Sequence, residues 1–433
     1  MSSKPGYKIT EIGEIPEDWE VMELRSVVKD HKAGIYKPRK IYGSGYNIVG
    51  VSDLYYHDSI KGQTFRLVRL TEEEKNEFSL KEGDIIYGES SLVKDGIGKA
   101  LVVTKAGEGT VFAWHTRRLT LDRSKVAPLF IHHVLNSRLI RRSIINRSTQ
   151  TALTGVTVKD YFDTLIPLPL LPEQQKIASI LSSVDEAIQK TDEIIQKAQE
   201  LKKGLMQQLL TKGIGHTKFK QTEIGEVPEE WPVFHLEKVV KFIKSGISRE
   251  FSSYDIGYPV IRSTNIQNNR LDLTDVKYWH LKDPQKANLK NYIIEDGDIL
   301  VNFINSINQI GKCCIFRIQD RDFIYTTNIF RVKLDQDILL HSYFHFFAQT
   351  SIYQNQIYRM IKPAVQQASI THRDFQKIEI PTPPIWEQQK IVSVLAEVDN
   401  KIEKEKQRKE QLEKLKKGLM QDLLTGRVRV KVD

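Results

Sequence analysis

The strongest constraint on the fold of this chain is an internal repeat. Residues 10–21 read TEIGEIPEDWEV and residues 222–233 read TEIGEVPEEWPV, and nine of the twelve positions are identical. Residues 173–190 match residues 387–404 at eleven of eighteen positions, and residues 201–211 match residues 415–425 at ten of eleven. Because the matches keep one order and nearly one offset, the 433 residues are two copies of a unit of about 212 residues.

Each copy ends in a region that reads as a long helix. Apolar residues recur in steps of four and three from Ile177 to Leu209 and again from Ile391 to Leu423, which is the seam of a coiled coil. A lone helix cannot bury such a seam, so we expect the two regions to pair antiparallel as a pseudo-two-fold coiled coil. That pairing would bring residues 424–425 close to residues 7–10. Glu405 and Lys409 interrupt the second seam.

The rest of each copy reads as a mixed α/β globular part. In the first copy we expect strands over 46–51, 84–87, 100–104, 112–121 and 165–168, and a helix over 128–145. In the second copy the counterparts are strands over 259–263, 298–303, 313–318, 323–334 and 378–380, and a helix over 338–360. The fold class is therefore α+β, with two similar globular parts joined by two long helices. The expected boundaries are 1–172 and 213–386 for the globular parts, with 173–212 and 387–433 for the helical regions and the tail.

Composition narrows the class of protein. The two helical regions, 173–212 and 387–424, hold 15 basic and 14 acidic residues, so almost all of the net charge of +9 belongs to the globular parts and the tail. A basic excess there favours an anionic partner, and the nearly neutral helices suit protein–protein contacts. No run of about 18 apolar residues and no apolar signal core occurs, so we expect a cytoplasmic protein that does not bind membranes. Cys313 and Cys314 are too few for a disulfide framework or a four-ligand zinc site.

Residue types that suit DNA gather in corresponding loops of the two copies. Arginine reads guanine edges, asparagine and glutamine read adenine, and lysine neutralises phosphates, although any one such residue can equally belong to a solvated helix face or an ordinary turn. The candidates in the first copy are Ser90, Ser91, Lys94, Arg117, Arg141, Arg142, Arg147 and Gln150. The candidates in the second copy are Asn302, Asn305, Asn308, Arg359, Lys362, Gln366 and Gln367.

The motifs that catalysis needs are missing from the sequence. We find no phosphate-binding loop, no Gly-x-Gly-x-x-Gly turn, no His-Glu-x-x-His metal site and no Asn/Asp-Pro-Pro-Tyr/Phe methyltransferase segment. Asp84 and Glu89 could be imagined as a nuclease pair, but Ser91 stands where a nuclease needs a lysine, so a structural turn is the better interpretation. His132 and His133 lie on an expected helix, where core histidines are far commoner than ligands. No cofactor and no metal are therefore expected.

The repeated motifs resemble the specificity subunit of type I restriction–modification systems over essentially the whole chain. The most specific parts are IPEDW and VPEEW (15–19 and 227–231), PLPLLPEQQKIASIL and PTPPIWEQQKIVSVL (167–181 and 381–395), and the two LKKGLMQ-x-LLT helix ends. The resemblance implies two target recognition domains that each read one half of a split, asymmetric sequence in double-stranded DNA. It also implies that catalysis belongs to partners, namely two methyltransferase subunits and ATP-dependent restriction subunits that translocate and cleave DNA.

Two other hypotheses remain open from the sequence. The chain could be a DNA-modifying enzyme in its own right, either a methyltransferase or a nuclease, and activity of the lone chain would reveal it. It could also be a coiled-coil scaffold that does not touch DNA, and a steep salt dependence of DNA affinity would count against that.

Overall fold

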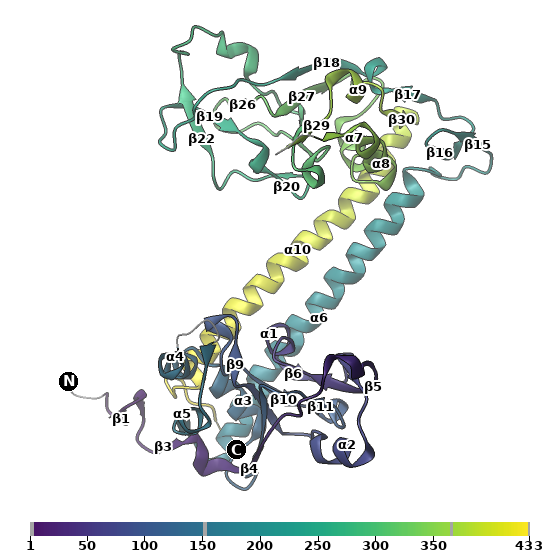
Figure 1. The fold of residues 1–433 in the computed structure, drawn as a ribbon. Coiled ribbons are helices and arrows are strands. Elements are labelled where there is room, and N and C mark those ends of the chain that lie inside the picture. The colour runs from purple at the N-terminus through teal and green to yellow at the C-terminus, as the bar shows by residue number, and fades with distance from the viewer. Residues whose placement is uncertain (1–3, 150–153, 364–366, 432–433) are drawn as a thin grey trace. The chain divides into compact units, whose positions relative to one another are not determined.

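Each copy of the repeat is built around a small antiparallel sheet. The computed structural model describes residues 4–149, 154–363 and 367–431. It divides into two compact units, the first made of residues 1–193 with 406–433 and the second of residues 194–405. Each unit therefore holds one globular part together with portions of both long helices (Figure 1).

The first unit has a five-stranded sheet in the order β4-β12-β8-β10-β6 and a three-stranded sheet in the order β11-β5-β7. Their bounds are β4 Val28–Ala33, β5 Tyr42–Val49, β6 Ser59–Ile60, β7 Arg66–Val68, β8 Ile85–Gly88, β10 Ala100–Val103, β11 Val111–Phe112 and β12 Thr116–Leu121. In the larger sheet all neighbours are antiparallel except β10 and β6. Strand β8 is buried along its whole length, which explains its continuous apolar run.

The second unit repeats this topology, with sheets in the orders β18-β27-β23-β25 and β22-β19-β26. The bounds are β18 Val240–Ser245, β19 Gly257–Ile261, β22 Lys277–His280, β23 Ile299–Asn302, β25 Cys313–Ile315, β26 Ile324–Tyr325 and β27 Ile329–Leu334. The order β4-β12-β8-β10 recurs as β18-β27-β23-β25, and the order β11-β5-β7 recurs as β26-β19-β22; the edge strand β6 has no counterpart in the larger sheet of the second unit among the described residues. The prediction that the two globular parts share one fold is confirmed.

Short strands and helices complete the two units. In the first they are β1 Tyr7–Thr10, β2 Gly13–Pro16, β3 Glu20–Glu23, α1 Asp53–Tyr56, α2 Glu72–Phe78, β9 Ser90–Ser91, β13 Thr154–Gly155, α5 Val158–Phe162 and β14 Leu165–Leu168. In the second they are β15 Phe219–Thr222, β16 Gly225–Pro228, β17 Val233–His235, β20 Ile266–Gln267, β21 Arg270–Leu271, β24 Ile304–Asn305, β28 Lys362–Pro363, β29 Ala368–Ser369, α9 His372–Phe375 and β30 Glu379–Pro381.

The helices behind the sheets are broken where the sequence predicted single helices. The expected helix 128–145 is two helices, α3 Pro128–Asn136 and α4 Arg138–Arg147, and 338–360 contains α7 His341–Phe347 and α8 Ser351–Met360. Ser137 and Thr350 have extended backbones, and their side chains accept the Ile140 and Tyr353 amides. Each hydroxyl caps the second helix of its pair. Because the capping residue has an extended backbone, the first helix ends before it.

The strands expected over 112–121 and 323–334 are also each divided into two. In the first unit a turn separates β11 from β12, and His115 within it has a φ of 66°. In the second unit β26 ends at Tyr325 and β27 begins at Ile329. The second break falls on the polar residues 326–328 (TTN), which the sequence analysis did not use as a turn signal, whereas the first falls on Trp114 and His115 and contains no glycine or proline.

The long helices are α6, Leu171–Leu209, and α10, Ile385–Leu423. In the first unit Asp185 and Asp192 of α6 pair with Lys416 and Lys409 of α10, so seven positions forward on one helix are seven positions back on the other. In the second unit Lys202 of α6 pairs with Asp399 of α10. The antiparallel pairing is confirmed, and Asp192 supplies a partner for Lys409, which the sequence analysis noted as a polar interruption.

The repeated PEDW and EQQK motifs form one buried contact. Trp19 is fully buried, and its indole Nε1 donates to Glu173 Oε2 at 3.1 Å, while in the second unit Trp231 donates to Glu387 Oε2 at 3.0 Å. Both contacts attach the start of a globular part to the first turn of a long helix. The Tyr7 hydroxyl also donates to the Gly426 carbonyl at 2.9 Å, which confirms that the end of α10 lies beside residues 7–10.

Candidate nucleic-acid interface

The loop after β8 carries the first group of expected DNA contacts, and it is pinned by a small two-stranded sheet. Ser90 and Ser91 form β9, which pairs with β13. Their side chains are buried, and Ser91 Oγ accepts the Val93 amide at 2.9 Å and lies 2.5 Å from the Tyr55 hydroxyl. The serines therefore shape the loop. Its exposed residues are Leu92, Val93, Lys94 and Asp95.

Three of the expected arginines bind their own domain. Arg117 on β12 donates from Nε to Glu89 Oε1 at 2.5 Å and also contacts His31. Arg141 on α4 donates to the carbonyls of Ile97 and Asp95, the second at 2.6 Å. Arg147 donates to the Asp163 carbonyl at 2.9 Å. These guanidinium groups brace the elements around the loop, with only part of their donor capacity left for a ligand.

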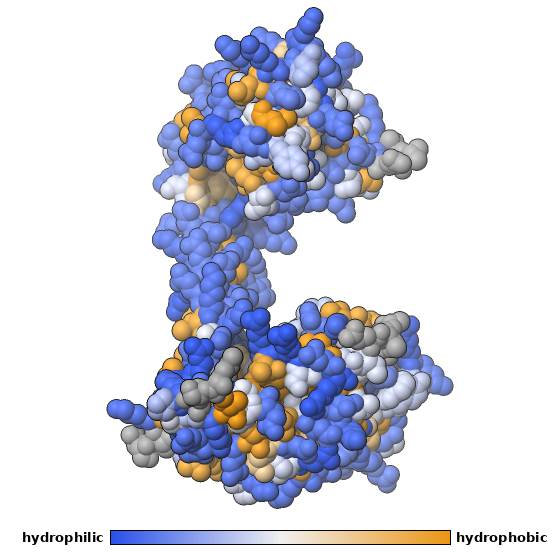
Figure 2. Space-filling view, turned by 90° about the vertical axis from the view of Figure 1, so that its left-hand side faces the viewer, coloured by the Kyte–Doolittle hydropathy of each residue, from blue (hydrophilic) through white to orange (hydrophobic). Residues whose placement is uncertain are grey.

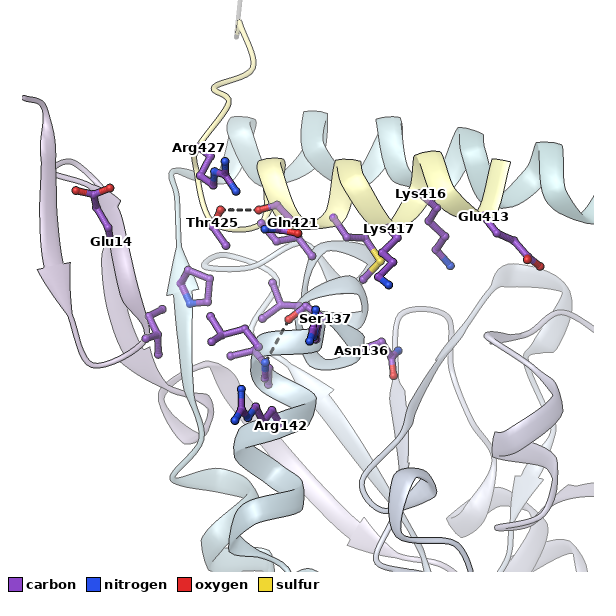
Figure 3. A pocket seen from close by; sticks show the side chains of 18 residues that line it. Glu14, Asn136, Ser137, Arg142, Glu413, Lys416, Lys417, Gln421, Thr425 and Arg427 are labelled. Carbon is purple, nitrogen blue, oxygen red and sulfur yellow. Dashed lines mark hydrogen bonds between the residues drawn. The ribbon is translucent and has the colours of Figure 1, made fainter. Parts of the chain in front are cut away.

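Arg142 is exposed and lies elsewhere, on a groove of about 800 Å³ between α3, α4 and the last turns of α10 (Figure 3). Arg138 and Lys417 line the same groove above apolar side chains that include Leu139 and Met420. Among the residues that the structure describes, no carboxylate pairs with Arg138, Arg142 or Lys417. These cations are therefore available to an anionic partner.

In the second unit, three expected contacts meet on one small sheet in the order β24-β29-β28. Asn305 pairs with Ala368 and Lys362 with Ser369, and Gln367 precedes β29 with its side chain exposed. The Lys362 ammonium lies 3.2 Å from Asp374 Oδ2 but stays 63% exposed. This surface, Asn305, Lys362 and Gln367, has the donors and acceptors that base edges require.

The remaining candidates are dispersed. Asn302 is fully buried, and its amide nitrogen lies 3.4 Å from the Ser263 carbonyl, so its side chain is not presented to a ligand. Asn308 is exposed in the short 3₁₀ helix Ile307–Gln309, and Arg359 is exposed near the end of α8. Gln150 and Gln366 lie outside the described residues.

One exposed aromatic group escaped the sequence analysis. Tyr36 and Trp114 are 67% and 52% exposed, with ring centroids 5.1 Å apart, and Trp114 stacks on His115 at 4.0 Å. The left-handed backbone of His115, with a φ of 66°, is uncommon for a residue other than glycine. The His115 carbonyl accepts the Glu89 amide at 2.8 Å, which joins this turn to the loop after β8. The sequence signal that could have revealed this group is the Trp-His pair, which interrupts an otherwise regular strand pattern.

The acidic and nucleophilic residues that could suggest catalysis have structural environments. Asp84 is buried and accepts the Lys81 amide and the Thr120 hydroxyl, which supports the interpretation of a structural turn. Burial raises the pKa of the Cys313 thiol to about 12, so it stays protonated and weakly nucleophilic. Within the described ranges, no group of three or more His, Cys, Asp or Glu side chains could hold a metal ion.

The surface around these sites is mostly hydrophilic, with scattered hydrophobic side chains on both globular parts (Figure 2). Leu92, Trp114 and Tyr254 are among the exposed ones. No helix among the described residues is long and apolar enough to cross a membrane.

Comparison with known proteins matches both copies to one family. Residues 16–200 and 228–414 each match the family described as type I restriction modification DNA specificity domain. The chain is 30% identical to the putative type I restriction enzyme MjaX specificity subunit of Methanocaldococcus jannaschii, over 98% of this chain and 97% of that protein. It is 28% identical to the MjaVIII specificity subunit of the same organism, over 96% and 94%.

Solved structures agree on the fold. The S subunit of a type I restriction–modification system from M. genitalium superposes with a TM-score of 0.59 at 15% identity, covering 97% of this chain and 98% of that one. A structure described as the basis of complex assembly and conformational transition of the type I R-M system gives 0.54 at 16% identity, covering 96% and 99%. The chain therefore belongs to the type I restriction–modification specificity subunits, which recognise DNA and are not themselves catalytic.

Proposed function

We propose that this chain reads an asymmetric two-part sequence in double-stranded DNA, with one half-site for each globular part. The observation that supports this most directly is that one scaffold occurs twice with different residues at equivalent places. In the first unit β9 is followed by the exposed residues Leu92, Val93 and Lys94, whereas in the second unit its counterpart β24 is followed by the exposed residues Ser306, Ile307 and Asn308. Different side chains on matched frames read different bases.

We assign recognition and spacing to separate regions, using the boundaries expected from the sequence. Residues 1–172 and 213–386 are the recognition domains, and the helical regions 173–212 and 387–433 space them. In the first domain, Lys94 and Arg142 meet phosphates, and the Tyr36–Trp114 pair offers flat faces for stacking or insertion between bases. In the second, Asn305 and Gln367 contact base edges and Lys362 and Arg359 contact phosphates.

Selection from a library of random DNA duplexes tests this function. The full chain is purified with its partner subunits, and bound duplexes are sequenced. We expect enrichment of two short motifs separated by a spacer of fixed length. Recovery of no motif, or of one uninterrupted motif, would refute the two-part reading.

We also propose that the chain places partner subunits on the chosen DNA. Methylation of a base requires its removal from the stack, so the specificity chain serves to hold two methyltransferase subunits at the site, and restriction subunits join the same cytoplasmic assembly. The lone chain, incubated with labelled S-adenosylmethionine or with magnesium and plasmid, should neither methylate nor cleave DNA. Activity of the lone chain would instead support an enzyme.

A further inference from the structure

The two globular parts contact the long helices at the same series of positions. On α6 these positions are four residues apart, and each recurs 214 residues later on α10. The pairs are Ile177 and Ile391, Leu181 and Leu395, Asp185 and Asp399, and Gln189 and Glu403. The first two pairs are buried apolar residues that belong to the core of their own unit. The last two pairs are polar, and they lie farther along each helix.

In the first unit, the polar contact is a cluster around Lys416. Its ammonium lies 2.5 Å from Asp185 Oδ1 on the neighbouring helix and 3.7 Å from Asp58 Oδ2 in the globular part. Asp58 also faces Lys99, at 3.4 Å. His133 of α3 lies 4.0 Å from Asp185, and its side chain is 2% exposed. Lys416 therefore joins three separate elements: both long helices and the globular part.

In the second unit, Lys202 takes the same place, since it precedes Lys416 by the repeat offset of 214. It lies 2.7 Å from Asp399 on the neighbouring helix and 3.3 Å from the Gln349 side chain in the globular part. Its side chain is 17% exposed, close to the 20% of Lys416. His345 of α7 lies nearby, as His132 and His133 of α3 do in the first unit.

In each unit a loop of the globular part makes one more contact with a long helix. Lys61 donates to Gln189 in the first unit, and Arg270 lies 2.7 Å from Glu403 in the second. The two loops that carry these cations differ in sequence, yet they contact the helices at equivalent positions. Each globular part therefore contacts its helix pair twice: at the buried apolar positions, and again at the polar positions one to three helical turns farther along. A single contact would let the globular part tilt on the helices, whereas two separated contacts fix its angle.

Resting on the proposed function, we propose that Lys416 and Lys202 are positioning residues that set the angle of each recognition domain on the helix pair, and thereby the spacing of the two half-sites. A domain of about 170 residues has a radius of gyration near 15 Å, so a tilt of about 13° moves its reading surface by about 3.4 Å, the rise of one base pair. A small loss of stiffness at these lysines is enough to change which spacer lengths are accepted.

The test is the duplex selection described above, repeated with Lys416→Met and Lys202→Met in the full chain with its partner subunits. Methionine keeps much of the side-chain length and removes the charge. Lys409→Met is the matched control, because Lys409 pairs with Asp192 of the same helix pair at 2.7 Å and has no ion pair with the globular part among the described contacts.

We expect the wild type and the control to discriminate at least about tenfold between their preferred spacer and one that is a base pair longer or shorter. Each methionine variant should reduce this discrimination to about threefold or less, with both half-site sequences unchanged. Lys416→Arg, which keeps a positive charge between Asp185 and Asp58, should retain most of the discrimination, so loss of the charge is distinguished from a general loss of stability.

Retention of the wild-type spacer preference by both methionine variants would overturn the proposal. Loss of the half-site motif itself would also overturn it, because the lysine would then be needed for the fold of the domain. A wild-type chain that selects no two-part motif would instead refute the proposed function, so the two failures are distinguishable.

Discussion

The two Trp–Glu contacts use the same buried pair but differ in the basic side chain that joins them. In the first unit Arg429, from the tail after α10, donates to Glu173 at 2.7 and 2.9 Å and to Asp18 at 2.8 Å. In the second unit His216, from the segment after α6, lies 3.0 Å from Glu387 and 3.6 Å from Glu230. Asp18 and Glu230 are the residues before the two tryptophans. In both units a basic side chain contacts the buried glutamate, and the identity of that side chain differs between the copies.

The difference extends to the number of donors around each carboxylate. Glu387 also accepts the Ile214 amide at 2.9 Å, so it keeps two donors, this amide and Trp231, if the histidine is removed. Glu173 would keep only the Trp19 indole among its described side-chain contacts. Removal of the Arg429 side chain therefore leaves Glu173 with fewer described donors than removal of the His216 side chain leaves Glu387, because the segment after α6 also supplies the Ile214 amide.

The largest expected effect tests what the two copies share. Trp19→Ala and Trp231→Ala should each destabilise their own unit by about 3–5 kcal/mol, because a large buried side chain is lost and a cavity remains. Amide hydrogen exchange, followed separately for peptides of each unit, should show faster exchange in the altered unit only. Equal loss of protection in both units would show that the copies do not open independently.

The next largest effect should differ between the two copies. Arg429→Ala should cost about 2–3 kcal/mol in the first unit, because a buried carboxylate loses its charged partner, although the arginine itself is 42% exposed. His216→Ala should cost about 1 kcal/mol in the second unit, the worth of an ordinary hydrogen bond. Hydrogen exchange of the two variants at the same pH measures both losses of stability and so compares them. A larger loss for His216→Ala would reverse the comparison.

Acidification should affect the first unit more than the second. Burial lowers the pKa of His132 to about 4 and holds the pKa of His133 well below its usual range. In the second unit burial also lowers the pKa of His345 to about 4 and lowers the pKa of His341, but the counterpart of the deeply buried His133 is Phe346.

The sign of this effect follows from the direction of the pKa shifts. The unfolded chain takes up a proton near pH 6.5 and the folded chain does not, so the stability that these histidines contribute falls as the pH drops from about 6.5 towards 4. For His132 alone, the loss between pH 7 and pH 5 is about 2 kcal/mol. Hydrogen exchange at the two pH values measures it, and His132→Asn should flatten the difference in the first unit. An unchanged pH dependence would contradict it.

The smallest expected effect concerns the polar interruption of the seam. The Lys409–Asp192 pair is 32% and 50% exposed, so Lys409→Ala should change stability by less than about 1 kcal/mol. Thermal unfolding of the variant provides the check. A larger loss would mean that this pair holds the helices together.

The sequence predicted the architecture well because a pattern that appears in both copies of the repeat is more informative than a pattern that appears once. Strand 165–168, the positions of the main strands along the chain and the antiparallel helices followed from patterns seen twice. The helix breaks at Ser137 and Thr350 were missed because a hydroxyl that caps one helix looks like any polar residue within a longer amphipathic pattern.

The candidate interface was harder to predict because residue type does not reveal burial. Ser91 and Asn302 occupy loops that suit DNA, yet their side chains are used inside the domain. Arg141 and Arg147 have the same chemistry as Arg142, and only the fold shows that the first two bind carbonyl groups while the third is exposed and has no partner among the described contacts. Trp114 was overlooked because an aromatic residue in a strand pattern is normally buried.

The central claim, that the paired helices determine the spacing of two independently read half-sites, is tested most directly by lengthening both helices. One heptad inserted after Glu193 in α6 and one after Glu405 in α10 lie at the boundary between the two units. Seven residues add about 10.5 Å, which equals about three base pairs. Duplex selection should return both half-site sequences unchanged with a spacer longer by about three base pairs. The same spacer, or altered half-sites, would contradict the account.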